Sequence, residues 1–278
     1  MKKAPVVMAV VAILTAASAA SAQSFTYVDF SSTTGLTLNG SAAQNGNKLM
    51  LTPADYNQAG SAWSTGKIQL SPTASFSTVF SFEILRTGGF VGEGADGLTF
   101  TLQNNANNVG GIGGGIGYFG IPNSVTVEFD TYPNGEIGDP NGNHVGISTN
   151  GNLTSLVTAN EATAFDNGGP WWAWIDYNGI TDNLAVRWAQ NTIRPTNAML
   201  SYTLDLPAIL GSSEVFVGFT SGTGGGFGEH NITSWNFEND FNQGGAPLPT
   251  VTPEPATLVL LGTGLVGVFG IARRRKLA

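Results

Sequence analysis

Short stretches of alternating apolar and polar residues run along most of this chain, and each ends at a cluster of Gly, Asn, Asp, Ser or Pro. Side chains in a strand alternate between its two faces, so the pattern predicts strands that bury one face. The stretches lie at residues 25–30, 36–38, 48–51, 67–70, 77–85, 98–102, 125–130, 171–177, 184–188, 199–204, 214–220 and 232–238. No part of this region has the apolar spacing of an amphipathic helix. Many strands with Gly- and Asn-rich turns predict an all-β sandwich.

The stretch at residues 125–147 adds candidate chemistry to this pattern. Val125, Val127 and Phe129 share one face of the predicted strand and suit a core. Glu128 and Asp130 share the other face, about 7 Å apart along the strand. Two neighbouring carboxylates repel each other, and each resists burial, so a compensating charge is expected. A divalent cation provides that compensation most directly.

The loop after this strand supplies further ligand types. It contains Asn134 and Asp139, and His144 then opens another short apolar run. Carboxylate, amide and carbonyl oxygens suit calcium, whereas a set with one imidazole suits manganese or zinc. The alternative is an acidic, solvated loop whose histidine makes an ordinary hydrogen bond. The whole set at this spacing favours a metal site.

The same stretch closely resembles the metal-binding segment of the legume (L-type) lectins, in which V-E-F-D-T-x-x-N precedes D-P and then H-x-G-I. The resemblance extends over residues 24–240 and implies a concanavalin-like jelly-roll β-sandwich. It implies two ion sites. The ligands implied for a transition ion, usually Mn²⁺, are Glu128, Asp130, Asp139 and His144. Those implied for Ca²⁺ are Asp130, the carbonyl oxygen of Tyr132, Asn134 and Asp139.

The tripeptide Ala95-Asp96-Gly97 precedes the predicted strand at 98–102. By itself, Asp before Gly is a common turn signal. The resemblance implies instead that the Asp96 carboxylate accepts hydrogen bonds from sugar hydroxyls. It also implies that the Ala95–Asp96 peptide bond is cis.

A glycine-rich run at 110–117 is a weak match to a phosphate-binding loop, because no Lys-Ser/Thr follows it. It resembles the family's G-G-x-L-G-x-F, which gives Gly114 a backbone N–H directed at the sugar; a flexible loop is the alternative. The resemblance also directs the amide of Asn134 and the ring of Tyr132 at the sugar. Gly225 and Gly226 are expected only as further backbone contacts.

The main enzymatic alternative is a glycoside hydrolase, because β-glucanases share this type of sandwich. Retaining glycosidases need a pair of carboxylates, and the jelly-roll glucanases carry E-x-D-x-E or E-x-D-x-x-E. Tyr132 and Pro133 occupy the positions of the second glutamate. The chain has no Cys, and neither histidine has a recognisable serine elbow. We therefore expect no enzymatic activity but a lectin; a matrix protein with the lectin fold and no significant sugar affinity is the alternative.

Four other conspicuous side chains are interpreted as structural. His230 has no partner at metal-ligand spacing and is expected at the surface or packed in the fold. Trp171, Trp172 and Trp174 fall in one predicted strand, where aromatic residues usually pack.

Both ends of the chain carry processing signals. Residues 1–22 begin with two lysines, continue with an apolar stretch and end in A-S-A, as a secretory signal peptide does. Residues 253–278 contain P-E-P, an apolar run at 256–272 long enough to cross a bilayer core, and a basic cluster. This order resembles the PEP-CTERM sorting signal of Gram-negative bacteria. It implies export to the cell surface, with transient anchoring in the inner membrane; a plain single-pass anchor is the alternative.

Between these ends we predict one domain at 23–241 and a linker at 242–252. Without the ends, five basic and 18 acidic residues remain, a net charge of −13. So acidic a domain is unsuited to nucleic acid. The implied partner is a carbohydrate such as an exopolysaccharide. A millimolar site provides only about −4 kcal/mol, so surface display or a homo-oligomer would add avidity.

Overall fold

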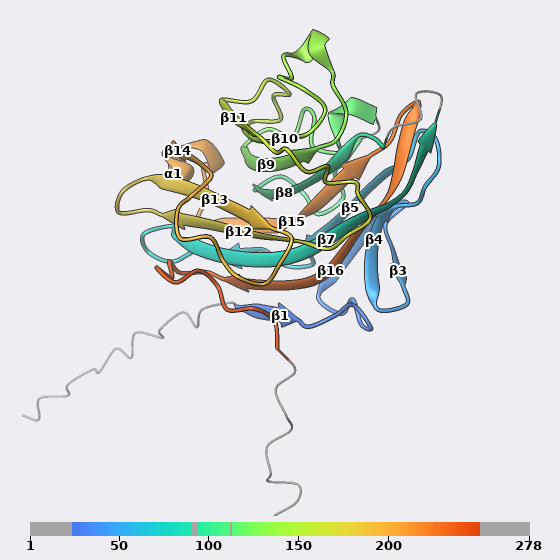
Figure 1. Ribbon diagram of the computed structural model, residues 1–278. Coiled ribbons are helices and arrows are strands. Elements are labelled where there is room, and N and C mark those ends of the chain that lie inside the picture. The colour runs from blue at the N-terminus through green and yellow to red at the C-terminus, as the bar shows by residue number, and fades with distance from the viewer. Residues whose placement is uncertain (1–23, 90–93, 112, 251–278) are drawn as a thin grey trace, which may run out of the picture.

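The computed structural model describes residues 24–89, 94–111 and 113–250, which form two antiparallel sheets packed face to face (Figure 1). Sheet A runs from edge to edge through β14 (Leu200–Thr203), β13 (Asn183–Ala189), β12 (Trp171–Asn178), β7 (Phe76–Gly89), β16 (Gly226–Glu238), β4 (Lys48–Thr52) and β3 (Ala43–Asn45), and β1 (Phe25–Tyr27) also pairs with β16. Sheet B runs through β11 (Val157–Asn160), β10 (His144–Thr149), β9 (Ser124–Asp130), β8 (Gly97–Gln103), β15 (Glu214–Gly222), β5 (Ala59–Ser64) and β2 (Leu36–Gly40), and β6 (Ile68–Gln69) also pairs with β15.

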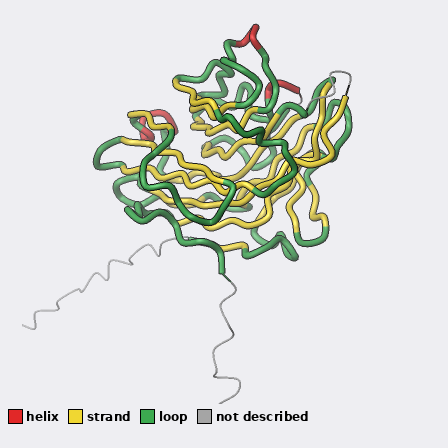
Figure 2. The backbone as a smooth tube through the Cα atoms, viewed as in Figure 1, coloured by secondary structure: helices red, strands yellow, loops and turns green. Residues whose placement is uncertain are grey.

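The predicted all-β sandwich is confirmed, and every stretch of alternating residues contains a strand. The alternation did not identify β3, β5 or β11, and it indicated β10 only as an apolar run. In the described residues, helix is limited to α1 (Leu206–Leu210) and the 3-10 turns η1 (Gly113–Gly115) and η2 (Gly135–Ile137), shown in red in Figure 2. None of the helices in this part of the chain has the length and apolar character to cross a membrane.

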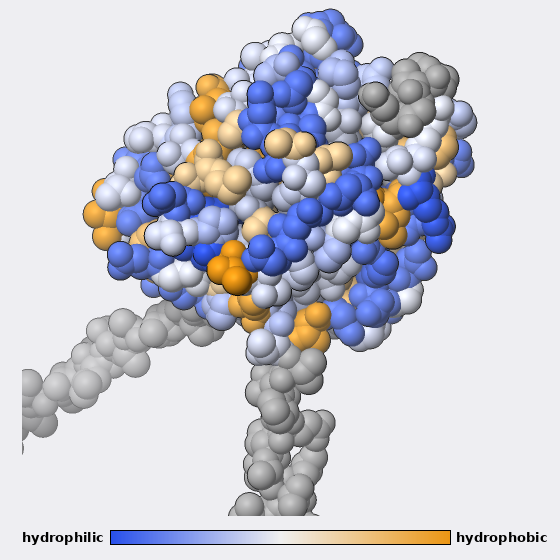
Figure 3. Space-filling model, viewed as in Figure 1, coloured by the Kyte–Doolittle hydropathy of each residue, from blue (hydrophilic) through white to orange (hydrophobic). Residues whose placement is uncertain are grey.

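Aromatic side chains fill the space between the two sheets, whereas the face of the molecule in Figure 3 is mostly hydrophilic, with small, separate hydrophobic patches. Phe80 of sheet A lies 5.0 Å from Phe219 and 5.9 Å from Phe129, measured between ring centroids, and both partners belong to sheet B. All three are fully buried. Burying one such side chain stabilises the fold by about 1.5–3 kcal/mol. The alternation of β9 therefore turns Phe129 inward and leaves Glu128 and Asp130 on the outer face of sheet B.

The loop between β8 and β9 folds back over that outer face. Ile116 and Tyr118 pack with Trp63 in a second, smaller hydrophobic cluster. The Thr220 hydroxyl donates a 2.6 Å hydrogen bond to the carbonyl oxygen of Ile116. Polar residues on the outer face of sheet B are consequently buried, and Thr99 is fully so.

Residues 242–250, where the composition predicts a linker, lie against the outer face of sheet A, at its lower side in Figure 1. Ala246 packs on Trp174, and the side-chain amide of Asn236 donates a 2.9 Å hydrogen bond to the carbonyl of Pro247. Trp174 faces away from the intersheet core, and this segment shields it from solvent. The predicted signal peptide at 1–22 and sorting segment at 253–278 lie outside the described residues.

Candidate functional site

Four strands of sheet B end side by side, and their ends gather residues distant in sequence. Asp130, the last residue of β9, pairs with His144 at the start of β10 and with Gly97 at the start of β8. Gly97 in turn pairs with Gly222, the last residue of β15. A Cβ atom on Gly97 would lie 2.2 Å from the carbonyl oxygen of Phe129, so glycine permits this close approach of β8 to β9. The loops that enter β8 and β10 and those that leave β9 and β15 therefore meet at one edge of the sandwich.

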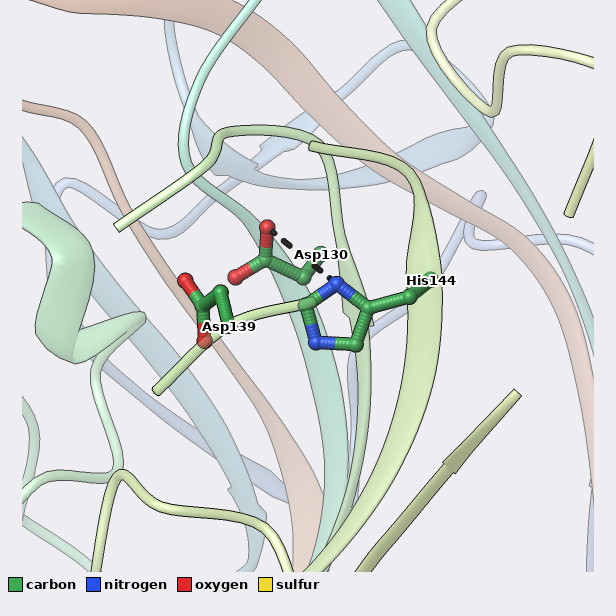
Figure 4. A group of neighbouring side chains, drawn as sticks. All are labelled: Asp130, Asp139 and His144. Atoms are coloured by element: carbon green, nitrogen blue, oxygen red, sulfur yellow. Dashed lines mark ion pairs between the residues drawn. The ribbon is translucent and has the colours of Figure 1, made fainter. Parts of the chain in front are cut away.

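A compact group of ligand atoms lies at this edge. One atom from each of Asp130, Asp139 and His144 lies within 4.8 Å of the others, and Figure 4 shows the three side chains directed toward one another. His144 Nδ1 lies 4.0 Å from Asp130 Oδ1 and 3.0 Å from the carbonyl oxygen of Asn141. His144 is fully buried and Asp130 is 2% exposed. The loop 131–143 thus brings Asp139 back onto the end of β9.

Glu128 lies beside this group, with its carboxylate bonded to neighbouring side chains. Its Oε1 is 3.8 Å from His144 Nε2. The Tyr118 hydroxyl donates a 2.6 Å hydrogen bond to Oε2, and the Ser155 hydroxyl donates one to Oε1. Sequence analysis missed Tyr118 and Ser155, which hold Glu128 in place. Nothing in the local sequence marks them, because only folding brings their loops over β9.

Burial and mutual repulsion change the acidity of three aspartates at this edge. Burial, followed by the charges of Glu128 and Asp139, raises the pKa of Asp130 well above its ordinary value. Burial also raises the pKa of Asp139, opposed by a hydrogen bond from the Asn134 backbone. Burial, followed by the charge of Asp139, raises the pKa of Asp96 to about 7. Each raised pKa means that the ionised carboxylate is short of compensating positive charge.

Asp96 lies at the same edge, directly before the first residue of β8. The Ala95–Asp96 peptide bond is cis, as the sequence resemblance implied. Hydrogen bonds fix the backbone of Asp96 on both sides, from its N–H to Gly222 at 3.0 Å and from the Thr131 N–H to its carbonyl at 3.1 Å. The Asp96 side chain is 4% exposed, and its Oδ2 has no hydrogen-bond partner among the described residues. An ideal Cβ on Gly224 would lie 3.5 Å from that oxygen, so the loop after β15 passes beside Asp96.

Gly114, in the loop between β8 and β9, lies against Asn134, in the loop between β9 and β10. A Cβ atom on Gly114 would be 2.7 Å from Asn134 Oδ1, so any larger residue would displace this amide. The Asn134 backbone N–H donates a 2.9 Å hydrogen bond to Asp139 Oδ2. Asn134 Oδ1 is buried and has no partner among the described side chains.

Tyr132 has its ring partly exposed, and its N–H donates a 2.8 Å hydrogen bond to Asp130 Oδ1. Gly225 and Gly226 lie at the start of β16, against Gly89 of β7. In the loop after β15, Gly224 is the glycine that lies beside the Asp96 carboxylate, and it was not among the expected backbone contacts.

The donors at this edge fit metal ions. Asp96 Oδ2, Asn134 Oδ1 and His144 Nε2 are buried atoms without a hydrogen-bond partner in the described part of the chain. Carboxylate and amide oxygens match the preferences of calcium, and a set that includes the imidazole matches a transition ion. A bound dication would also supply the positive charge that the raised pKa values indicate is needed.

The residues interpreted as structural are packed. His230 is fully buried, and its Nδ1 lies 2.7 Å from the Thr52 hydroxyl. Trp171 packs in the intersheet core, and Trp174 packs under residues 242–250.

This jelly-roll sandwich matches the fold of solved lectins and carries acidic and imidazole side chains at one sheet edge. The model of the legume lectin domain matches residues 22–250, so the chain belongs to the legume lectin domain family. The model of the PEP-CTERM protein-sorting motif matches residues 251–276. Both resemblances seen in the sequence are therefore confirmed, and the sorting motif indicates an exported protein directed to the cell surface.

Individual relatives agree with this assignment. A lectin from Leucomphalos mildbraedii is 33% identical over 238 residues, which cover 77% of this chain and 95% of that protein. A solved structure of a Bauhinia forficata lectin in complex with GalNAc is 28% identical, has a TM-score of 0.69, and covers 78% of this chain and 98% of that one. The Arabidopsis thaliana L-type lectin-domain containing receptor kinase VIII.1 is 32% identical over 203 residues, or 70% of this chain. The chain spans 26–42% of the length of three such receptor kinases.

Proposed function

We propose that this protein is an exported, metal-dependent lectin that binds a mono- or oligosaccharide noncovalently at the edge of sheet B. The observation that carries the proposal is the group of Asp130, Asp139 and His144, whose ligand atoms lie within 4.8 Å of one another. In addition, Asp96 Oδ2, Asn134 Oδ1 and His144 Nε2 are buried without a hydrogen-bond partner among the described residues. Membership of the legume lectin family supports carbohydrate binding in general. The donor types support the dependence on metals.

The proposed ion ligands follow the two donor classes. A transition ion such as Mn²⁺ takes Glu128, Asp130, Asp139 and His144. A Ca²⁺ ion takes Asp130, the Tyr132 carbonyl, Asn134 and Asp139. When bound, the ions supply the positive charge that lets these buried carboxylates stay ionised beside one another.

The proposed sugar site lies beside the ion ligands at this edge. Asp96 accepts hydrogen bonds from sugar hydroxyls, and the Asn134 NH₂ group donates one, because an amide offers a donor and an acceptor at its two ends. The Gly114 N–H reaches the sugar because no side chain intervenes. The Tyr132 ring covers an apolar face of the pyranose. Gly225 and Gly226 contribute at most backbone contacts.

The test is glycan-array binding by the full-length protein with Ca²⁺ and Mn²⁺, repeated after chelation with EDTA. Asp96→Asn is compared with Asp29→Asn, which changes a carboxylate remote from this edge that accepts a hydrogen bond from Ser31. We expect binding by the unmodified protein and by Asp29→Asn, and loss of binding on chelation and in Asp96→Asn. Stability that depends on metals, with no glycan retained, would refute the lectin proposal and favour a structural matrix role.

A further inference from the structure

A second group of charged side chains lies on the outer face of sheet A. Asp176 of β12 is 2% exposed. Its Oδ2 accepts a 3.1 Å hydrogen bond from Arg187 Nη1 and a 2.6 Å hydrogen bond from Arg194 Nη2. Arg187 lies on the neighbouring strand β13, and Arg194 lies in the loop that follows it. Two guanidinium groups therefore share one carboxylate oxygen.

The charges in this group do not balance. Two positive side chains face one negative side chain, whereas Lys48 pairs with Glu83, and Arg86 with Glu229, one to one. Both arginine side chains are less than one-fifth exposed. Burial, followed by the charge of the neighbouring arginine, lowers the pKa of Arg187, and Asp176 only opposes this effect. The group retains one poorly solvated positive charge in a domain that is otherwise strongly acidic.

Several polar atoms in the group have no partner. Asp176 Oδ1 and the Nε atoms of both arginines are buried and make no hydrogen bond with any described residue. Leaving a buried polar group unpaired costs about 1–3 kcal/mol, and more when it is charged. The two arginine Nε–H groups can donate to an anionic group, and Asp176 Oδ1 can accept from a hydroxyl. The group is therefore suited to a ligand that carries both an anionic group and hydroxyls.

A cavity of about 180 Å³ adjoins these side chains. Neutral polar groups dominate the rest of its lining, together with the ring of Phe241, which is 37% exposed. The polar groups come from Asn178, Thr181, Asn183 and Gln243. Amides, a hydroxyl and an accessible aromatic ring are the groups that recognise a polyhydroxylated ring.

We infer that this cavity binds a carboxylate-bearing sugar unit, such as a hexuronate, at a second saccharide site that needs no metal ion. The sugar carboxylate pairs with the guanidinium groups, which match carboxylates in geometry as well as charge. Its hydroxyls bond to Asp176 Oδ1 and to the amides of Asn183 and Gln243. The ring packs on Phe241. A neutral sugar would leave the extra positive charge unpaired, and a small anion would leave the amides and the aromatic ring unused.

The site belongs to sheet A, whereas the proposed metal-dependent site lies at an edge of sheet B. The two proposals therefore fail independently. The experiment titrates the full-length protein with D-glucuronate in the presence of EDTA, followed by NMR or calorimetry. D-glucose supplies the ring without the carboxylate, and acetate supplies the carboxylate without the ring. We expect glucuronate to bind at least about tenfold more tightly than either of them, which is about 1.4 kcal/mol.

Three variants locate the binding. Arg194→Gln removes one guanidinium and should weaken glucuronate binding about tenfold or more. Phe241→Ala removes an exposed ring, so the fold is retained, and it should weaken glucuronate binding while leaving acetate binding unchanged. Lys67→Gln is the matched control, because it removes one positive charge that lies over Phe216, away from the cavity. Thermal unfolding checks that each variant is folded.

Each other outcome overturns the inference. Equal binding of acetate and glucuronate means a simple anion site, and equal binding of glucose means that the carboxylate is not recognised. Binding that is lost in EDTA belongs to the metal-dependent edge. Glucuronate binding that Phe241→Ala leaves unchanged removes the cavity from the explanation, and no binding by the unmodified protein removes the site altogether.

Discussion

The buried His230 provides a prediction about acid sensitivity that can be worked out quantitatively. His230 of β16 is fully buried beside Thr52 of the neighbouring strand β4, and burial lowers its pKa from 6.5 to about 3. A backbone hydrogen bond to Gly228 opposes this shift. The folded protein therefore holds a neutral imidazole at pH values where the unfolded chain takes up a proton. Because the folded pKa is the lower one, this residue costs stability as pH falls from about 6.5 toward 3.

The size of the effect follows from the two pKa values. At pH 5 the charged form of the unfolded histidine outnumbers the neutral form about thirtyfold, while the folded histidine stays neutral. The corresponding loss in the free energy of unfolding is about 2 kcal/mol at pH 5, relative to pH 8. Carboxyls with raised pKa values, such as Asp96, act in the opposite direction, because the folded state holds their protons more tightly. The comparison must therefore be made against a variant that lacks only the histidine.

His230→Gln is a suitable variant, because glutamine can still bond to the Thr52 hydroxyl and does not titrate. Urea unfolding of both proteins at pH 8 and pH 5 gives the difference in stability between them at each pH. We expect this difference to change by about 2 kcal/mol in favour of the variant at pH 5. A difference that stays constant with pH would refute the reasoning. NMR gives a direct control: the chain has two histidines, so the variant assigns the His230 ring signals, which should not titrate between pH 8 and 5.

Three further predictions address the proposed sugar site, the proposed ions and the core. Gly114→Ala places a methyl group 2.7 Å from Asn134 Oδ1 and so displaces that amide. Glycan binding should fall about tenfold or more, with little change in fold. Unchanged binding would exclude this loop from the site. Removing bound ions with EDTA should lower the free energy of unfolding by about 2.7 kcal/mol for each ion, measured by urea unfolding against ions at a hundredfold excess over Kd; an unchanged free energy of unfolding would exclude bound ions. Phe129→Ala should cost about 3–5 kcal/mol of stability in the same assay, whereas Phe129→Leu should cost clearly less; equal losses would mean that cavity formation is not the cause.

Much of the fold could be predicted because local patterns encode it. The alternation in β9 places Phe129 inward and Asp130 outward without any knowledge of neighbouring strands. Asp96, by contrast, lies 34 positions before Asp130, and only resemblance to a family linked the two in advance. The register of β8 with β9 then gives the physical reason for their proximity.

The remaining features depend on long-range packing, for which the sequence carries no local signal. Tyr118 and Ser155 reach Glu128 from two different loops. Residues 242–250 have the composition of a linker but cover Trp174, because an aromatic side chain on the outer face of a sheet still needs an apolar neighbour. The composition of a segment reflects only its own residues, so it cannot predict which surface of the domain the segment packs against.

The two proposed sites have different physical requirements, and this bears on how a weak binder could hold a polymer. The proposed site at the edge of sheet B would use cations to offset its carboxylates, whereas the cavity on sheet A is lined by two arginines and one aspartate. Since the sites lie on different sheets, one chain could hold two separate saccharide strands at once. Where one polymer chain reaches both sites instead, two linked weak sites can exceed either affinity by about 10²–10⁴ without any new contact. A protein of this kind would cross-link an acidic polysaccharide as a monomer, and chelation would remove only one of its two attachments.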